Sequence, residues 1–315
     1  METCDSGVLA WLATHGPVCA PAGASFAIGG ISIGIDDPCF HAQAYAIPSL
    51  EPFRLAACVP DILIRVDWVR NLPAMQASPA FDSGCTWRLY QADCGLQFDF
   101  FVPASGTKPY KRLLIDRQFT RATLQISEEH ASGNFPLTYP LDELLIMHRL
   151  TQERAIELHG AGIVRADGVG NLFVGHSGAG KSTTTRLWTE REGVEVLSDD
   201  RIIVRRDTLA NHSKSTGVRM YGTPWHGEAM YASPDSAPLA RIFVLEHGVG
   251  NVLTGLTPSQ AVAELFARSF VPFHNHEYVE AALNFLQELA DTIPVYRYSF
   301  EPNQGAVDQV LKFCD

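Results

Sequence analysis

The stretch Gly175-His176-Ser177-Gly178-Ala179-Gly180-Lys181-Ser182 fits the pattern G-x-x-x-x-G-K-[ST] at every fixed position. Glycines in this pattern let backbone N–H groups turn inward around a phosphate, because a larger side chain would block the approach. The ammonium group of Lys181 is expected to contact the outer phosphates, and the hydroxyl of Ser182 is expected to ligate Mg²⁺. The stretch therefore predicts a site for a nucleoside triphosphate with Mg²⁺.

The residues on both sides of this loop have the pattern that such a loop requires. Residues 172–174 predict a short buried strand before it, and residues 182–191 predict a helix after it. The N-terminus of that helix carries partial positive charge where the phosphates are expected. The alternative is a chance glycine-rich turn between a strand and a helix, and the complete pattern disfavours it.

Length, charge and cysteine usage narrow the class of protein. The 315 residues predict about two domains with an ordinary globular composition. The net charge of −11 argues against a nucleic-acid partner, which would need a basic stripe. Seven cysteines without C-x-x-C spacing favour reduced thiols and a cytoplasmic location. Residues 6–35 carry no charge, but Glu2 and Asp5 argue against a signal peptide, and a membrane role is not expected.

Residues 1–136 are expected to form a small, mainly antiparallel β domain. Period-2 alternation and turn residues predict its strands at residues 62–69, 87–90, 96–100, 110–116 and 119–126. The second and third of these flank Asp93-Cys94-Gly95 and predict a hairpin, and the last two predict another antiparallel pair. Nothing in this part of the chain indicates chemistry.

Residues 137–315 are expected to form an α/β nucleotide-binding domain with α+β character. Pro140 opens a predicted helix, and Thr257-Pro258-Ser259-Gln260 resembles a capping box that opens another helix through residue 270. The Asp167-Gly168 pair predicts a β-hairpin directly before the loop. Further strands are predicted at residues 158–164, 194–197, 202–206, 218–221, 241–246 and 295–300, helices at 277–290 and 306–313, and an exposed loop at 207–216.

Several polar residues beyond the loop are candidates for the chemistry. Asp199 and Asp200 end a predicted strand, where carboxylates can hold Mg²⁺ or its water; a solvated strand end is the alternative. A Gly/Pro turn gathers Trp225, His226 and Glu228, and a substrate or nucleotide role and simple turn chemistry both stay open there.

Two further patterns have an ordinary explanation beside the functional one. Arg219 could neutralise a transferred phosphate or occupy a surface strand position. His274-Asn275-His276 predicts a polar loop rather than a metal site, because a third ligand is missing.

The order of Leu158-His159-Gly160, the Asp167-Gly168 hairpin, the glycine-rich loop and Asp199-Asp200 resembles the C-terminal domain of HPr kinase/phosphorylase. The resemblance covers roughly residues 140 to 315. It implies a phosphoenolpyruvate-carboxykinase-like P-loop domain of the kind found in HPr-kinase-related proteins with a small, divergent N-terminal domain.

The resemblance also implies roles for individual residues. Asp199 becomes the base, Ser182 and Asp200 hold Mg²⁺, and the order of the two aspartates stays open. His159 would lie beside the phosphates with a catalytic role, as would Lys181. The residues implied to bind ATP are Gly175, His176, Ser177, Gly178, Ala179, Gly180, Lys181, Ser182 and Thr183.

The chain departs from the family in two places. His176 stands where the family carries Asp, and the downstream signature that engages the family's protein substrate is not found. An acceptor other than HPr is therefore expected.

The sequence predicts an ATP- and Mg²⁺-dependent kinase that transfers a phosphoryl group to a serine-like hydroxyl of a protein, peptide or small molecule. The alternative is an ATP-binding regulatory module that hydrolyses ATP slowly or not at all. A carboxykinase is disfavoured by the short chain, and a GTPase by the lack of an Asn-Lys-x-Asp run. The oligomeric state stays open, a homo-oligomer included.

Overall fold

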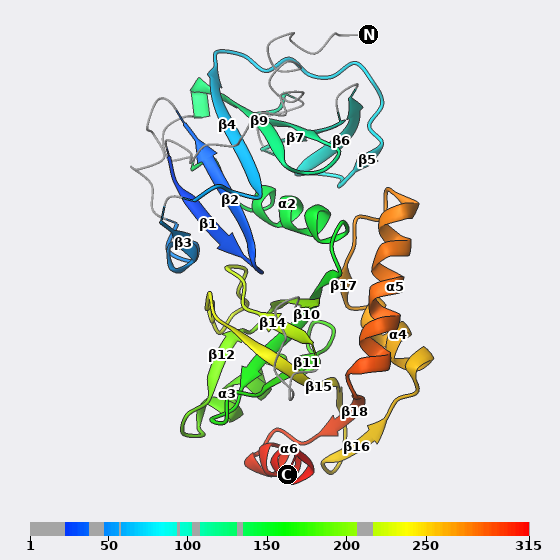
Figure 1. Ribbon diagram of the computed structural model, residues 1–315. Helices are drawn as coiled ribbons and strands as arrows, with labels where there is room; N and C mark the ends of the chain where they lie inside the picture. The colour runs from blue at the N-terminus through cyan, green and yellow to red at the C-terminus, as the bar shows by residue number, and fades with distance from the viewer. Residues whose placement is uncertain are drawn as a thin grey trace. The chain divides into compact units, whose positions relative to one another are not determined.

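The computed structural model describes residues 23–37, 47–56, 58–92, 95–102, 108–130, 135–206 and 217–314 (Figure 1). Contacts divide the chain into two compact units, Met1–Ala27 with Ile31–Ile146 and Ile28–Gly30 with Met147–Asp315. The division between the larger segments follows residue 146, within helix α2 (Leu141–Leu150). The described residues form a mixed α and β protein with five α-helices and two sheets.

The first unit is built on a nine-stranded sheet in the order β3-β1-β2-β4-β9-β8-β7-β6-β5. Its strands are β1 (Ser25–Ile28), β2 (Ile31–Asp36), β3 (Arg54–Leu55), β4 (Ile62–Val69), β5 (Phe81–Asp82), β6 (Trp87–Ala92), β7 (Gly95–Phe100), β8 (Lys111–Asp116) and β9 (Arg121–Ser127). Short 3₁₀ helices span Glu51–Phe53 and Glu128–His130. The predicted antiparallel pairs β6–β7 and β8–β9 are confirmed. The sheet is nevertheless mixed, because β4 pairs in parallel with β2 and β9.

Two basic side chains are buried in this sheet. The Arg112 guanidinium makes a two-pronged pair with Asp99, with Nε–Oδ1 and Nη2–Oδ2 distances of 2.7 Å. Lys111, only 1% exposed, donates from Nζ to the Pro136 carbonyl at 2.9 Å and to Thr138 Oγ1 at 3.0 Å. Burial lowers the pKa of Lys111 to about 8, against the opposing charge of Asp142. The folded protein therefore holds this proton more weakly than the unfolded chain does.

The second unit combines nine strands with helices that pack on both faces of its sheet. The strands are β10 (Ala155–Val164), β11 (Gly170–Val174), β12 (Glu195–Ser198), β13 (Arg201–Arg206), β14 (Val218–Tyr221), β15 (Ser236–His247), β16 (Val252–Gly255), β17 (Ser269–Phe270) and β18 (Val295–Phe300). The helices that follow α2 are α3 (Lys181–Thr189), α4 (Pro258–Phe266), α5 (His276–Thr292) and α6 (Gln304–Cys314). The strands and helices that the sequence predicts in this unit are thus present, apart from the end of α4. The loop predicted at 207–216 lies outside the described residues.

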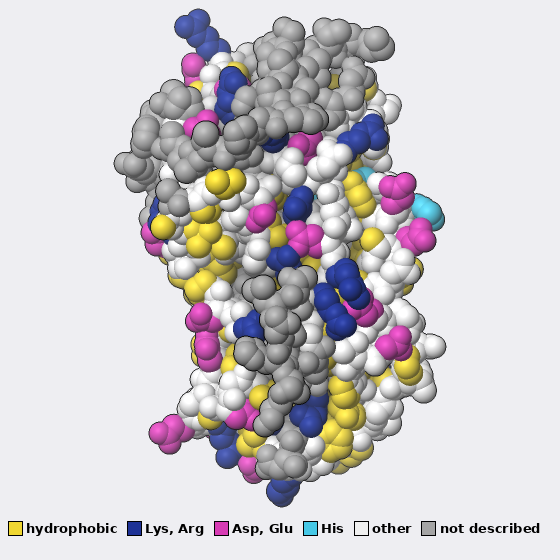
Figure 2. Space-filling view, in the orientation of Figure 1, with side chains coloured by type: hydrophobic (Ala, Val, Ile, Leu, Met, Phe, Trp, Pro, Cys, Tyr) yellow, Lys and Arg dark blue, Asp and Glu magenta, His cyan; other side chains and the backbone are white. Residues whose placement is uncertain are grey.

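The surface carries both signs of charge. On the face that Figure 2 presents, Lys and Arg side chains lie interspersed with Asp and Glu side chains. Within the described ranges, no helix is long and apolar enough to cross a membrane.

Strand β11, which leads into the glycine-rich loop, has one antiparallel and one parallel neighbour in the sheet. It pairs antiparallel with β10, which confirms the predicted hairpin, and parallel with β15. Strand β15 in turn pairs in parallel with β18. Strand β10 also pairs with β12, β13 and β17. These three strands are therefore linked to the strand that carries the loop by way of β10.

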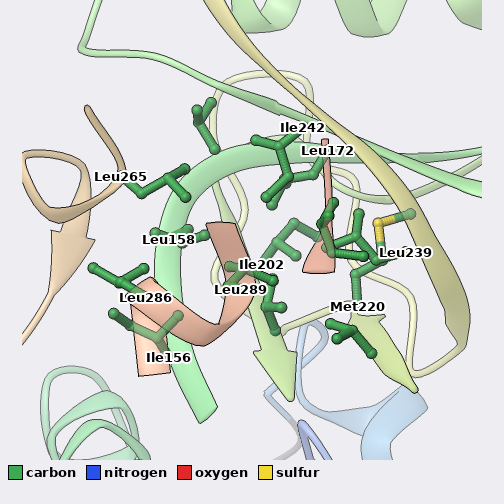
Figure 3. Close-up of a cluster of buried hydrophobic side chains, with 14 of the residues drawn as sticks. Ile156, Leu158, Leu172, Ile202, Met220, Leu239, Ile242, Leu265, Leu286 and Leu289 are labelled. Atoms are coloured by element: carbon green, nitrogen blue, oxygen red, sulfur yellow. The ribbon is translucent and has the colours of Figure 1, made fainter. Parts of the chain in front are cut away.

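Alternating side chains of β11 enter two different hydrophobic clusters. Leu172 and Val174 belong to the cluster that α4 and α5 cover, whereas Phe173 belongs to the cluster that α3 and α6 cover. Figure 1 shows α4 and α5 side by side, and Figure 3 shows Leu172 in the same cluster as Leu265 of α4 and Leu286 of α5. Because all five residues of β11 are buried, both faces of the strand that carries the loop are fixed by packing.

Helix α4 begins as predicted and ends early. Thr257 and Gln260 form the expected capping box, but the helix stops at Phe266 rather than at residue 270. Ser269 and Phe270 instead form β17 and pair with β10. The prediction was wrong here because this pairing joins residues far apart in sequence, which a local helical pattern does not reveal.

Candidate functional site

The glycine-rich loop adopts a backbone that requires glycine at two positions. Gly178 has φ +80° and Gly180 has φ +101°, and both values lie in the left-handed region that L side chains rarely adopt. The Ala179 N–H donates to the His176 carbonyl at 3.1 Å, which closes a tight turn inside the loop. Gly180 then caps the N-terminus of α3. The loop thus joins β11 to α3 as the sequence predicts.

Lys181 is held against the loop from which it extends. Its side chain is largely buried, and its Nζ donates to the Gly175 carbonyl at 3.0 Å and to the His176 carbonyl at 3.2 Å. Burial lowers the pKa of Lys181, the charge of Asp200 raises it and the charge of Arg201 lowers it. These effects indicate that the ammonium group lies within electrostatic reach of Asp200.

His159 and Asp200 form a pair next to the loop. The imidazole Nε2 of His159 lies 3.0 Å from Oδ1 of Asp200, and Arg201 pairs with Oδ2. The Gly175 N–H donates to the His159 carbonyl at 3.2 Å, and the Gly160 N–H donates to the Asp200 carbonyl at 2.9 Å. These main-chain bonds bring the first glycine of the loop beside the pair.

The environment of Asp200 favours its ionised form. Burial raises the pKa of Asp200, but the hydrogen bond with His159 and the charge of Arg201 outweigh burial, so the pKa lies below its ordinary value. Asp200 therefore carries a negative charge at neutral pH and can accept a proton or ligate a cation.

Asp199 has a different environment from its neighbour. It is 1% exposed, and its carboxylate accepts hydrogen bonds from the main-chain N–H groups of Gly227 at 2.9 Å, Ala229 at 2.9 Å and Tyr231 at 3.3 Å. A Cβ atom at residue 227 would come within 2.9 Å of Asp199 Oδ2, so this close approach requires glycine. Asp199 therefore anchors the loop of residues 225–231.

The remaining candidates on and near this loop have separate environments. Trp225 is buried, and its carbonyl accepts from Ser198 Oγ at 3.4 Å. His226 Nδ1 lies 3.1 Å from the Gly227 carbonyl, and Glu228 is exposed. Trp225 thus lies in the interior and Glu228 at the surface.

Arg219 is engaged by the neighbouring strand β15. Its Nη2 donates to the Ser236 carbonyl at 3.0 Å and to Ser236 Oγ at 2.9 Å. These contacts fit the strand interpretation of Arg219, and they involve neither the glycine-rich loop nor the Asp200 pair.

Sequence reasoning missed Arg268. Its main-chain carbonyl accepts from the His159 N–H at 2.7 Å, and its Nη1 donates to Glu264 Oε2 at 2.6 Å and to the Glu264 carbonyl at 2.7 Å. The side chain is more than nine-tenths buried, and within the described ranges its Nε has no hydrogen-bond partner.

Arg268 acts electrostatically on the glycine-rich loop. Its charge is the largest cause of the lowered pKa of His176, ahead of burial, and it also lowers the pKa of Lys181. The charge of Arg268 therefore acts on the loop, and the charge of its partner Glu264 offsets part of that effect at His176. No motif identifies Arg268. The helix predicted through residue 270 also gives no reason to expect that its main-chain carbonyl bonds to β10.

Phe270 packs against both partners of Asp200. The Arg201 guanidinium carbon lies 4.5 Å from the centre of the Phe270 ring, and the His159 ring meets it edge-on with centroids 6.1 Å apart. The Phe270 ring thus restricts the positions that His159 and Arg201 can adopt.

The side chains available for Mg²⁺ are few. Across the described ranges, no group of three or more His, Cys, Asp or Glu residues could hold a metal ion. Mg²⁺ in phosphoryl-transfer sites is bound by one or two protein oxygens, with phosphates and water completing the shell. The exposed hydroxyl of Ser182 and the ionised carboxylate of Asp200 fit that requirement.

Comparison with protein-family models and with curated proteins found no relative of this chain. The chain matches no protein-family model, and no curated protein is significantly similar to it.

Proposed function

We propose that the second unit binds ATP with Mg²⁺ and transfers the γ-phosphoryl group to a serine-like hydroxyl of a protein, a peptide or a small molecule. The observation that carries the proposal is the hydrogen bond from the Gly175 N–H to the carbonyl of His159, whose imidazole contacts Asp200. A glycine-rich phosphate loop and an ionised carboxylate thereby lie together, and phosphoryl transfer uses both. We also propose a phosphoenolpyruvate-carboxykinase-like fold related to HPr kinase.

The loop and the start of α3 hold the triphosphate in this proposal. Apart from the N–H groups of Gly175 and Ala179, which donate within the protein, the main-chain N–H groups of the loop would receive the phosphate oxygens. The Lys181 ammonium would move from its loop carbonyls to the β- and γ-phosphates. Ser182 would ligate Mg²⁺, which would neutralise charge on the same phosphates, and Thr183 follows it in the first turn of the helix. The positive charge of Arg268 would stabilise the negative charge that develops on the transferred phosphoryl group.

Asp200 rather than Asp199 is the proposed base. The carboxylate oxygens of Asp199 already accept three main-chain hydrogen bonds, so using it as a base would weaken the hold on the loop of residues 225–231. Asp200 is ionised and only partly buried, and His159 fixes its orientation. The acceptor hydroxyl would attack the γ-phosphorus in line with the leaving oxygen, and its proton would pass to Asp200.

The test uses γ-labelled ATP, Mg²⁺ and a cell extract as the source of acceptor. We expect the wild-type protein to label an acceptor, and Asp200→Asn to bind ATP with unchanged affinity without labelling that acceptor. Unimpaired labelling by Asp200→Asn would refute the assignment of the base.

A titration with Mg²⁺ separates the role of base from the role of metal ligand. If Asp200 is the base, the variant stays inactive at every Mg²⁺ concentration, because proton transfer is lost. If Asp200 is chiefly a ligand of Mg²⁺, as the family resemblance implies, a higher Mg²⁺ concentration restores activity.

The regulatory module is the second candidate. The observation that favours it is that both oxygens of Asp200 are already engaged, one by His159 and the other by Arg201. Wild-type protein that binds ATP but neither labels an acceptor nor releases phosphate would support this alternative over the kinase.

A further inference from the structure

Three parallel strands of the second unit end at the same edge of the sheet. Strand β11 pairs in parallel with β15, with Val174 opposite Val244, and β15 pairs in parallel with β18, with His247 opposite Phe300. The glycine-rich loop, His247 and Phe300 therefore leave the sheet at the carboxyl ends of neighbouring strands. In α/β sheets this is the edge at which ligands bind.

His247 contacts the glycine-rich loop directly. Its Nε2–H donates to the Gly178 carbonyl at 2.6 Å. Its ring stacks on the ring of Phe300, with centroids 6.2 Å apart and planes 27° apart. Phe300 is buried against the loop, because a Cβ atom at Gly180 would come within 2.5 Å of the Phe300 ring. An exposed imidazole thus rests on a fixed aromatic support beside the phosphate loop.

The turn after His247 is held in place by polar contacts. The Gly250 N–H donates to Glu301 Oε1 at 2.8 Å, and the Glu301 N–H donates to Asn251 Oδ1 at 3.0 Å. The turn carries Val249, which is 94% exposed. A fixed turn therefore presents an apolar side chain two residues from an exposed aromatic ring.

The order of the strands separates the catalytic side of the loop from the His247 side. Strand β11 pairs with β10, which carries His159, and on its other side with β15, which ends at His247. In phosphoryl transfer the attacking and leaving oxygens lie in line on opposite sides of the phosphorus. A hydroxyl that approaches from Asp200 therefore requires the nucleoside to leave the loop away from Asp200, toward β15.

We infer that His247, supported by Phe300 and flanked by Val249, is the platform on which the base of the bound nucleotide stacks. The inference rests on the proposed function, because it assumes that the loop holds a nucleoside triphosphate. Every base has a π face, so stacking on His247 would contribute affinity with little discrimination between bases.

The test compares ATP with inorganic tripolyphosphate, which has the phosphates but no base, by calorimetric titration of the full chain with Mg²⁺. We expect His247→Ala to weaken ATP binding about tenfold and to leave tripolyphosphate binding unchanged. His247→Phe keeps an aromatic ring without the hydrogen bond to Gly178 and is expected to retain ATP affinity. His276→Ala, at another exposed histidine, is the matched control and should change neither affinity.

Each other outcome contradicts a defined part of the argument. Equal losses of ATP and tripolyphosphate affinity in His247→Ala, or no loss of either, would overturn the platform, as would a His247→Phe variant that binds ATP no better than His247→Ala. Wild-type protein that binds neither ligand would overturn the proposed function itself and the platform with it.

Discussion

The Nε2 atom of His159 lies 3.0 Å from Oδ1 of Asp200, and the main chain of His159 accepts a hydrogen bond from the first glycine of the glycine-rich loop. One residue therefore orients the proposed base and also joins that base to the glycine-rich loop. His159 acts through Asp200 in this arrangement, so it is a positioning residue.

Replacing His159 should change how the rate depends on pH. In His159→Gln the hydrogen bond that lowers the pKa of Asp200 is altered, so that pKa should rise toward its ordinary value. Because the base must be ionised, the acid limb of the pH–rate profile should move to higher pH, and the transfer rate at neutral pH should fall by up to about 10²-fold through misalignment. Because an ordinary aspartate has a pKa of about 4, both acid limbs lie near or below that pH, so rates are measured from about pH 2.5 to pH 7. An unchanged acid limb would contradict the role given to His159.

The two adjacent aspartates should fail in different ways. Asp199→Ala leaves three main-chain N–H groups of the 225–231 loop without their acceptor, which should lower the free energy of unfolding by about 3 kcal/mol. Asp200→Asn should change the free energy of unfolding by less than about 1 kcal/mol, because its carboxylate is partly exposed to water. Urea unfolding of both variants measures the difference. Equal losses of stability would contradict the anchoring role of Asp199.

Removing Arg268 should slow transfer more than it weakens nucleotide binding. Arg268→Gln removes the charge that acts on His176 and Lys181, and the rate of transfer is expected to fall about 10³-fold, the lower range for arginines that stabilise a transferred phosphoryl group. The matched control is Arg297→Gln, because Arg297 also pairs with Glu264, at 2.6 Å. If both variants lose the same activity, Arg268 acts through Glu264 and not on the phosphates.

Lys111 should make the stability of the first unit depend on pH. Its pKa is about 8 in the folded protein and 10.5 for an ordinary lysine, so the unfolded chain binds more protons between these values and the free energy of unfolding rises with pH. The full difference corresponds to about 3 kcal/mol, which is a cost below pH 8 and is removed toward pH 10.5. Urea unfolding of wild type and Lys111→Met at pH 7, 8.5 and 10 tests this. A difference between the two proteins that stays constant over the three pH values would contradict it.

Features set by neighbouring residues could be predicted from the sequence. The strand, loop and helix around Lys181, the hairpin at Asp167-Gly168 and the capping box at Thr257 each depend on a few adjacent residues, and each is present in the structure. Their backbone geometry is specified locally by glycines, capping side chains and alternating apolar residues.

Features set by pairing between distant residues could not be predicted. The parallel pairing of β4 with β2 and β9 and the pairing of β17 with β10 join segments that carry no local mark of their partner. The place of Arg268 beside His159 could not be predicted for the same reason. The environments of Asp199 and Asp200 also differ through distant partners, namely the amides at 227–231 and the imidazole at 159, so their spacing from the loop does not distinguish their roles.

Asp199 holds its loop through main-chain amides, and an amide is the same whatever side chain its residue carries. An exposed position such as Glu228 can therefore be exchanged, in evolution or in the laboratory, while the path of the chain is conserved. The exposed side chains of this segment can therefore change what they bind while the neighbouring Asp199 and the backbone that it holds stay the same.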